Sequence, residues 1–372
     1  MKKIAMLYFL KKSKKHKILI FRTDRIGDLI NTSPFFKSIK NHYKETEVTL
    51  VCSKYNSIVA SRYPFIDKIL IYDKSLSLRE KFKFFVSIFL NIYDLIIAFD
   101  GKKISYVVSS LAISKFKYAV GFKKQKKILN FKYNTFRPSK LILKLFFTNY
   151  IVCDENYKDL NANLEFNNHY LSMYYYLLKK NNIHLNHLNH IYFHDKDFET
   201  CHKNFLKKNI NNKYLLIHID EKWDKLNLNL KWFNDLLLKI SKKYQIIISS
   251  GINNSNLFNT LKSNYNSFQY IDESIVSQIN QFQNKNIFLL EKLNLGLIAY
   301  FIEGCALFIS SHSGATFHIS SSFEKPTFDF VMKNIDLELN RWIPLNMKNN
   351  YKRIFSEEYK VLENEIKKVL NY

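Results

Sequence analysis

Cysteine, glycine and proline are all scarce in this sequence, and the pattern of the cysteines excludes two structural classes. The 372 residues include 4 cysteines, 7 glycines and 5 prolines. No two cysteines form a CxxC pair, which argues against a zinc knuckle and a disulfide framework and suits a reducing cytoplasm. Low glycine and proline content, beside abundant Asn, Lys, Ile and Phe, is typical of an AT-rich genome and says little about function.

Long hydrophobic runs are missing as well. No apolar stretch reaches the roughly 18–20 residues that a membrane-spanning helix needs. The opening segment, MKKIAMLYFLKKSKKHK, has an apolar core at residues 4–10 between lysines. This core is short for a signal peptide, and no small-residue cleavage site follows it. We therefore expect a membrane-surface anchor, or a solvated basic tail with an incidental apolar patch, rather than a cleaved signal.

Acidic residues are unevenly distributed along the chain, whose net charge is +25. Residues 1–150 hold 31 basic and 9 acidic residues, a balance of +22, whereas residues 151–372 hold 26 and 23, a balance of +3. Within 101–150 there are 12 basic residues and no acid. Such a concentration of basic charge attracts a polyanion, which could be nucleic acid, an anionic membrane or a phosphorylated substrate.

Strand and helix patterns alternate twice along the chain, which predicts two doubly wound α/β domains with mainly parallel sheets. In the first half we expect strands at 17–22, 48–52, 68–72, 95–99 and 118–121, and helices at 28–42, 76–91 and 103–114. In the second half we expect strands at 214–219, 244–249, 286–290, 306–310 and 326–331, and helices at 230–242, 254–263, 294–303, 315–322 and 356–370.

A polar, irregular segment near 184–213 follows an amphipathic stretch at 167–183 and predicts the link between the domains. We assign 1–185 to the first domain, 186–213 to a linker region and 214–372 to the second domain. The last helix is a candidate to pack back on the first domain. Sheets of this kind bind ligands at the carboxyl ends of their strands, and two facing domains would place a cleft between them.

The stretch KILIFRTDRIGDLINTSPFFKSIK, residues 17–40, is the first candidate site, because a strand pattern gives way there to a helix pattern. Gly27 allows a tight turn, and Asp28 falls near the positive end of the helix dipole. An isolated Asp28 reads most simply as a helix cap. Arg22 and Arg25 strengthen a functional interpretation, in which they hold an anionic substrate beside a carboxylate base.

Small residues at a second strand–helix junction, FISSHSGATFHISSSFEKPTF at 308–328, predict an anion site. A run of small residues before a helix exposes backbone N–H groups, and a diphosphate would fit there. Many ordinary strand–helix turns are equally rich in Ser and Gly. A third stretch, IHIDEKWDKLNLNLKWF at 217–233, places Lys225 where it could neutralise a phosphate, although lysines usually mark a solvated face.

Two further patterns carry weaker signals. His184, His187, His190 and His194 recur at three- or four-residue spacing, but the segment is Asn-rich and has no interleaved acid or Cys, so we expect no metal there. The stretch at 115–140 interleaves aromatic residues with lysines. That pattern fits a nucleic-acid groove, and equally a membrane-facing patch.

Taken in order, the motifs resemble those of the heptosyltransferases of glycosyltransferase family 9, which build the inner core of bacterial lipopolysaccharide. The family's opening strand–loop–helix has Gly-Asp and Thr-x-Pro positions, filled here by Gly27, Asp28, Thr32 and Pro34. The segments at 66–74, 169–183 and 217–225 resemble later family elements, and 310–328 resembles the donor-binding signature. The likeness covers most of the chain and depends on the order and spacing of the motifs.

The resemblance implies a GT-B fold, with two Rossmann-like domains facing across a cleft. The first would bind a lipid-linked, anionic acceptor and the second a nucleotide sugar, typically ADP-heptose. It implies an inverting transfer in which Asp28 deprotonates the acceptor hydroxyl. No cofactor besides the co-substrate is implied, and no metal is strictly required, because backbone amides and a lysine offset the charge on the leaving diphosphate. A phosphorylated acceptor would also account for the basic first half.

The same resemblance assigns roles to individual residues. Asp28 is the expected catalytic base. The expected acceptor-binding residues are Arg22, Arg25, Arg62, Lys123 and Lys124. The expected nucleotide-sugar-binding residues are His218, Lys225, His312, Ser313, Gly314, Ala315, Thr316 and His318.

Departures from the family pattern keep alternatives open. His312 stands where the signature usually has Asp, one extra residue precedes His318, and Asp220 and Glu221 stand where small hydroxyl residues often flank the phosphates. We expect a transferase that adds heptose to the core of lipopolysaccharide or lipooligosaccharide, peripheral on the cytoplasmic face of the bacterial inner membrane. The alternatives are another nucleotide sugar, a protein or other glycan acceptor, a non-catalytic relative, and a basic nucleic-acid-binding protein, for which we find no recognised motif.

Overall fold

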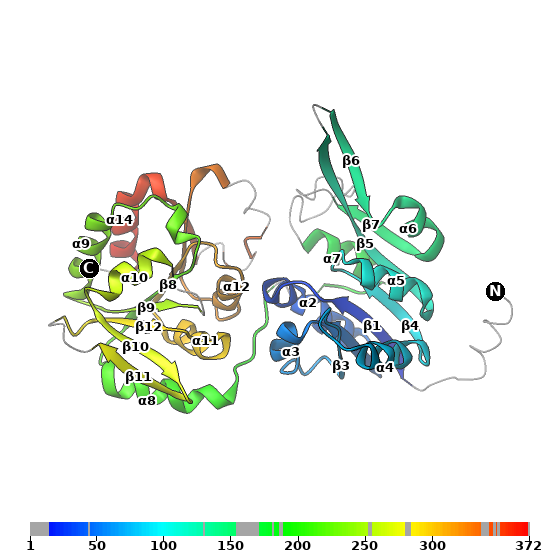
Figure 1. Ribbon diagram of the computed structural model, residues 1–372, viewed down its shortest axis with the longest axis horizontal. Helices are drawn as coiled ribbons and strands as arrows, with labels where there is room; N and C mark the ends of the chain where they lie inside the picture. Colours follow the sequence, from blue (N-terminus) through cyan, green and yellow to red (C-terminus); the bar gives the residue numbers. More distant parts are fainter. Residues whose placement is uncertain are drawn as a thin grey trace. The chain divides into compact units, whose positions relative to one another are not determined.

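The computed structural model describes residues 15–370 except 44, 129–130, 154–170, 181, 186–188, 252–254, 280–283, 336–341, 345–346 and 348–349. The expected apolar segment at 4–10 and His187 lie outside the described residues. The chain divides into two compact units, Met1–Leu188 and Asn189–Tyr372, and each contains its own sheet (Figure 1). Within the described part of the chain, no helix is both long and apolar enough to cross a bilayer.

The first unit is built on a seven-stranded sheet with the order β3-β2-β1-β4-β5-β6, in which β7 also pairs with β5. Its pairs are parallel except for β5 with β6. The strands are β1 (His16–Arg22), β2 (Thr46–Cys52), β3 (Lys68–Ile71), β4 (Ile92–Ala98), β5 (Ile113–Ile128), β6 (Phe131–Arg137) and β7 (Asn149–Cys153). The helices are α2 (Ile26–His42), α3 (Lys54–Ala60), α4 (Leu78–Phe89), α5 (Lys103–Leu111), α6 (Lys140–Phe146) and α7 (Leu171–Lys179).

Apolar side chains on both faces of the central strands explain why helices cover this sheet. Phe84 and Ile88 of α4 share a core cluster with Leu19 and Phe21 of β1. Phe35 of α2 packs edge-on against Phe99, which follows β4, and the two ring centroids are 4.7 Å apart. These contacts hold the end of β1 and the start of α2, where the first motif lies, in a rigid setting.

The second unit is built on an eight-stranded sheet with the order β11-β10-β12-β9-β8-β13-β14-β15, parallel except for β10 with β11. The strands are β8 (Tyr214–Ile219), β9 (Gln245–Ser250), β10 (Asn266–Ile271), β11 (Ser274–Ile279), β12 (Ile287–Glu291), β13 (Leu307–Ser310), β14 (Thr327–Val331) and β15 (Tyr351–Phe355). The helices are α8 (Glu199–Asn209), α9 (Leu230–Ser241), α10 (Asn256–Lys262), α11 (Leu295–Gly304), α12 (Gly314–Ser322) and α14 (Tyr359–Leu370), with short 3₁₀ turns η1 (Lys196–Phe198), η2 (Trp223–Lys225), η3 (Lys333–Ile335) and η5 (Ser356–Glu358).

Helix α14 contributes to the core of the second unit. Its apolar residues Leu362, Ile366 and Leu370 belong to the core cluster of the second unit, together with side chains of α9, α10 and the central strands. The apolar side of the last helix therefore packs within its own unit, and its expected contact with the first domain stays a prediction.

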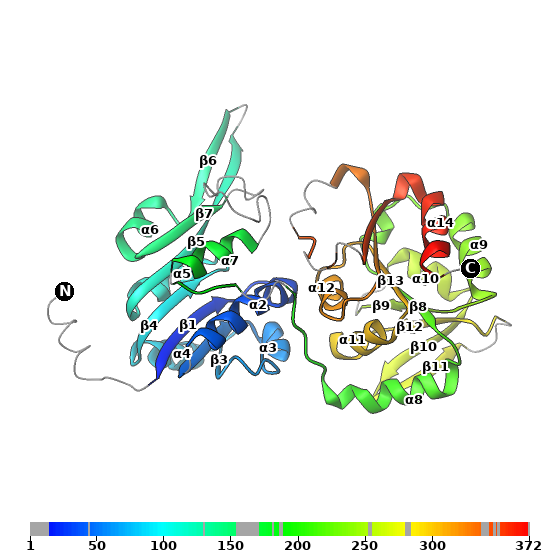
Figure 2. The same ribbon diagram turned by 180° about the vertical axis from the view of Figure 1, so that it is seen from behind.

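Two segments differ from the sequence-based expectation. The supposed irregular link contains α8, because Phe205 among its polar neighbours packs against Phe268, Phe288 and Phe301 of the second unit. The basic stretch at 115–140 consists mostly of β5 and β6, which extend as a two-stranded ribbon from the sheet (Figure 2).

Candidate functional site

Each sheet has a point where the strand order reverses direction, and open α/β sheets bind ligands there. In the first unit, β2 and β4 lie on opposite sides of β1. In the second unit, β9 and β13 lie on opposite sides of β8. The three sequence motifs follow β1, β8 and β13, so the fold places all of them at the two reversal points.

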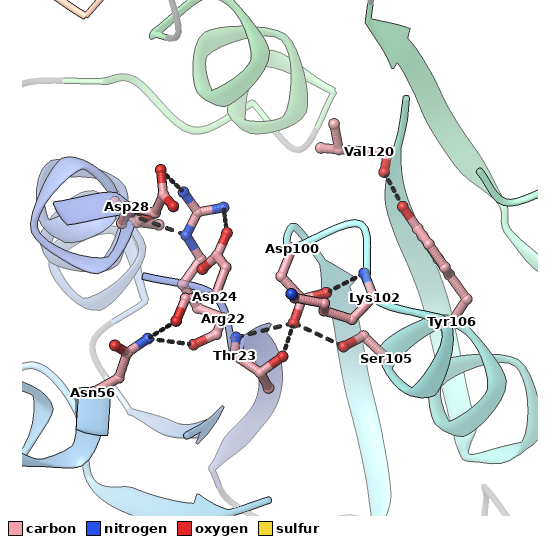
Figure 3. Close-up of polar contacts among 11 residues, drawn as sticks. Arg22, Thr23, Asp24, Asp28, Asn56, Asp100, Lys102, Ser105, Tyr106 and Val120 are labelled. Carbon is pink, nitrogen blue, oxygen red and sulfur yellow. Dashed lines mark hydrogen bonds and ion pairs between the residues drawn. The ribbon is translucent and has the colours of Figure 1, made fainter. Parts of the chain in front are cut away.

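In the first unit, the side chain of Arg22 lies between two carboxylates (Figure 3). It is only 4% exposed, with one terminal nitrogen 3.2 Å from Asp24 Oδ2 and the other 3.7 Å from Asp28 Oδ1. Arg22 Nε also donates to the backbone carbonyl of Asp28 at 3.1 Å. The Asp28 side chain remains 25% exposed, so this buried arginine orients a carboxylate that a substrate can reach.

Asp28 is not the N-cap of helix α2. The N-cap residue is Arg25, and no side chain caps this end of the helix. Asp28 lies in the first helical turn, where the helix dipole favours a negative charge. The simple capping interpretation therefore does not account for its side chain, which contacts Arg22 instead.

Asp24 is an acid that the sequence reading did not single out. Burial raises its pKa to about 8. The guanidinium of Arg22 opposes this rise in the pKa, whereas the charges of Asp28 and Asp100 add to it. Its Oδ1 is buried without a hydrogen-bond partner among the described residues. Burial therefore favours the protonated form of Asp24, and the contact with Arg22 favours its carboxylate.

Asp100, after β4, fixes the loop that follows β1. Its Oδ2 accepts hydrogen bonds from the N–H of Thr23 at 2.9 Å, the Thr23 hydroxyl at 2.6 Å and the Ser105 hydroxyl at 2.8 Å (Figure 3). The amide of Asn56 holds the same loop from α3, through the carbonyls of Arg22 and Asp24. Sequence reasoning missed Asp100, although an Asp-Gly pair directly after a strand marks such a junction.

The basic ribbon begins beside this loop. Gly101 has a φ of +64°, and a Cβ there would lie 2.8 Å from the ring of Phe122 on β5. Lys123, the next residue, is half-buried, whereas the side chain of Lys124 lies outside the described residues. Arg25 is exposed beside Asp28, and half-buried Arg62 follows α3. Acceptor binding by these basic residues stays a prediction.

In the second unit, His218 at the end of β8 is buried within hydrogen-bond distance of Ser249, with Nδ1 3.1 Å from Oγ. Burial, together with the ammonium of Lys222, lowers the pKa of His218 to about 4, so the imidazole is neutral at pH 7. The indole of Trp223 donates to the His218 carbonyl at 2.9 Å. His218 is thus a buried residue that supports the loop after β8.

His312 lies in the loop after β13 in a left-handed conformation, with a φ of +47°. Its Nδ1 lies 2.7 Å from Oδ2 of fully buried Asp329, which also accepts the Tyr351 hydroxyl at 2.9 Å and lies 3.5 Å from Arg353. Burial acts to raise the pKa of Asp329, but the contacts with His312, Arg353 and Tyr351 hold it below the usual value. The imidazole is therefore fixed against an ionised acid.

Lys222 is a third residue to which sequence reasoning gave no role. Its Nζ donates to the carbonyl of His312. Lys225 is exposed at the end of η2, and the neighbouring Asp224 accepts from the first backbone N–H groups of α10 at 3.0 and 3.1 Å. Lys222 and Lys225 thus lie on one turn. Of the two, Lys222 contacts the predicted donor loop, through the His312 carbonyl.

Helix α12 begins at the predicted anion site. Its N-cap, Ser313, makes no side-chain capping bond, and a Cβ on Gly314 would meet no atom within 4 Å. The open start of the helix leaves room for an anion on the amides of Gly314, Ala315 and Thr316. Burial raises the pKa of Asp220, whereas the ammonium of Lys222 and a hydrogen bond from Ser313 oppose that rise.

The histidines at 184–194 and His318 lie in different surroundings. His318 is buried with its ring 4.8 Å from that of His190. His194 stacks between Tyr300 and Phe323. Among the described residues, no group of three or more His, Cys, Asp or Glu side chains could hold a metal ion.

Comparison with known proteins agrees with this architecture. No protein-family model matches the chain. A Haemophilus influenzae protein named "Putative glycosyltransferase" is 22% identical over 339 residues, which cover 89% of this chain and 86% of that protein. The family 9 glycosyl transferase of Veillonella parvula aligns with a TM-score of 0.67 and 13% identity, covering 95% of this chain and 89% of that one.

A second solved structure, the E. coli ADP-heptose lipopolysaccharide heptosyltransferase II, aligns with a TM-score of 0.64 and 11% identity, covering 95% of this chain and 98% of that one. The sequence relative and both structural neighbours carry glycosyltransferase names. The resemblance to family 9 inferred from the motifs is thereby confirmed, as is the GT-B type of fold.

Proposed function

We propose that this protein is an inverting glycosyltransferase that moves heptose from ADP-heptose to the inner core of lipopolysaccharide or lipooligosaccharide. Its fold and its similarity to known glycosyltransferases support the proposal. The observation that carries the proposal is the pair formed by Asp28 and Arg22, which stands at the reversal point of the first sheet. The acceptor is an anionic, lipid-linked glycan, and the protein works peripherally on the cytoplasmic face of the inner membrane.

Asp28 is the proposed general base. Its partly exposed carboxylate takes the proton from the acceptor hydroxyl, whose oxygen attacks the anomeric carbon while the bond to the diphosphate breaks. Arg22 holds the carboxylate through the backbone and side-chain contacts described above, so that little reorganisation precedes the attack. The basic ribbon after Phe122 extends from the same edge of the sheet and supplies the positive field that an anionic acceptor requires.

The leaving diphosphate is proposed to bind at the start of α12. Backbone amides at a helix N-terminus stabilise negative charge, and Lys222 and Lys225 add positive charge on the neighbouring turn. These groups offset the charge on ADP without a metal ion.

His312 bears on the choice of donor. The imidazole is held by Asp329 at the loop that would face the sugar or diphosphate, where the resemblance expects an acid. A histidine there presents a hydrogen-bond donor or acceptor in place of a fixed negative charge. A nucleotide sugar other than ADP-heptose is therefore the main alternative within the same reaction class.

Calorimetric titration of the purified protein with ADP-heptose, ADP, UDP and GDP tests the donor side. We expect binding of the adenine nucleotides and none of UDP or GDP. Selective binding of UDP or GDP would change the donor and keep the reaction class. A protein that binds no nucleotide but binds a single-stranded oligonucleotide in 0.15 M salt would contradict the transferase proposal.

A further inference from the structure

Helix α6 exposes an unusual amount of apolar surface for so short an element. Its sequence is KLILKLF, and one residue, Leu143, is fully buried. The other apolar side chains point to solvent within the described part of the chain, and both lysines of the helix are exposed as well. The exposed apolar residues are Leu141 (65%), Ile142 (39%), Leu145 (67%) and Phe146 (45%).

This face is held in place by the body of the first unit. Leu143 and Phe147 share a core cluster with Ala98, Ala119 and Tyr106. Thr148, just after the helix, exchanges backbone and side-chain hydrogen bonds with Lys117 of β5 at 2.9 Å. Leu143 and Thr148 therefore attach α6 to the first unit, and its other apolar residues remain exposed.

More exposed apolar surface lies on the elements that share this core. Tyr106 brings α5 to the same cluster, and Leu111 at the end of α5 is 63% exposed. Phe116, 40% exposed, directly precedes Lys117, which the bonds to Thr148 place beside the end of α6. The exposed surface therefore continues from α6 towards the start of β5.

The positive charge around the exposed face of α6 indicates which kind of partner it binds. Lys140 and Lys144 lie on the helix, Lys115 lies beside Phe116, and residues 101–150 contain no acid. Apolar side chains surrounded by lysines match a bilayer surface with anionic headgroups, because the lysines contact phosphate while Leu and Phe enter the acyl boundary. A second copy of the chain would oppose one lysine-rich face to another.

We propose that the exposed face of α6 inserts into the surface of an anionic bilayer and attaches the first unit to it. The inference does not depend on the transfer reaction, since it follows from the exposure and charge of α6, and it locates the membrane contact on a folded element.

The test compares full-length variants by co-sedimentation with vesicles at 0.15 M salt. Wild-type protein should bind vesicles of phosphatidylglycerol and phosphatidylethanolamine and leave pure phosphatidylcholine unbound. The double variant Leu141→Ser/Leu145→Ser should lose roughly tenfold or more in apparent affinity. The matched control is Leu78→Ser/Phe82→Ser on α4, whose side chains are 86% and 68% exposed on a helix with charges of both signs, and it should bind like the wild type.

A second measurement separates insertion from loss of folding. A Leu145→Trp variant should show a blue-shifted emission with anionic vesicles, quenched by brominated lipid, while an exposed tryptophan from Phe82→Trp should not respond. Unchanged vesicle binding of the α6 double variant would overturn the proposal. So would equal loss in the α4 control, or a dimer that the α6 changes dissociate without any vesicle binding by the wild type.

Discussion

Arg22 and Asp28 are joined twice, through the Nε of the arginine to the aspartate carbonyl at 3.1 Å and through a terminal nitrogen to Oδ1 at 3.7 Å. The five residues between them carry the chain from the last position of β1 into the first turn of α2. The guanidinium therefore fixes the turn and the carboxylate together, and a substitution at either residue is expected to alter the geometry of the proposed base.

The first prediction concerns Arg22→Lys. Lysine cannot maintain two planar contacts at once, so the carboxylate of Asp28 loses its orientation. We expect kcat to fall roughly 10- to 100-fold, with KM for the nucleotide sugar unchanged because the donor binds elsewhere. Arg79→Lys, at an exposed arginine of α4, is the control and should keep its kcat within about twofold. A raised donor KM with normal kcat in Arg22→Lys would contradict this role.

The second prediction concerns Asp24 and pH. Its pKa of about 8 in the folded protein lies above the usual value, so the folded state binds more protons between about pH 4 and pH 8. The stability contributed by protonated Asp24 is present at low pH and is lost as the pH rises through 8. Asp24→Asn should flatten that loss. Urea unfolding at pH 5, 6, 7 and 8 measures it, and parallel stability curves for both proteins would refute the assignment.

The third prediction contrasts two glycines. Gly101→Ala should lower the free energy of unfolding by roughly 1–3 kcal/mol, because of its φ of +64° and the close ring of Phe122. Gly314→Ala meets no atom within 4 Å, so its stability should stay within about 1 kcal/mol of the wild type. Its methyl group, however, occupies space at the start of α12, and ADP affinity measured by calorimetry should fall roughly tenfold. Unchanged ADP binding in Gly314→Ala would argue against an anion site there.

The fourth prediction concerns the two lysines on the turn after β8. Lys222→Ala and Lys225→Ala should each weaken ADP binding about 5- to 50-fold, since each removes a positive charge near the proposed diphosphate. Lys231→Ala, exposed on α9, is the matched control and should bind ADP like the wild type. If all three variants lost affinity alike, the effect would be the overall charge of the unit and not a site.

Sequence reasoning predicted the central strands well, because buried parallel strands such as β1 and β8 read as unbroken apolar runs between turn signals. It missed β6 and most of β5, whose lysines alternate with aromatic residues and read equally as a surface patch. It also missed α8, where Phe205 is one apolar anchor in a polar segment. In each case tertiary contacts, not local pattern, decide the structure.

Some residues of the candidate site could be predicted from the sequence, whereas others depend on tertiary contacts. Asp28 and Gly314 were predicted from local motifs, since strand–helix junctions are visible in a sequence, whereas the role of His312 was implied by the family resemblance. The partner of Thr23 is Asp100, 77 residues away, and that of His312 is Asp329 on a neighbouring strand. Pairings of this kind depend on which strands become neighbours, and one sequence does not reveal that order.

The most direct test of the central claim is the rate of ADP release by Asp28→Asn, measured beside the wild type with ADP-heptose and core-truncated lipopolysaccharide. Asparagine keeps the size of the side chain and removes the base. The account predicts turnover by the wild type, a loss of roughly 100-fold or more in Asp28→Asn, and equal ADP binding by both proteins. Wild-type turnover in Asp28→Asn would contradict the account.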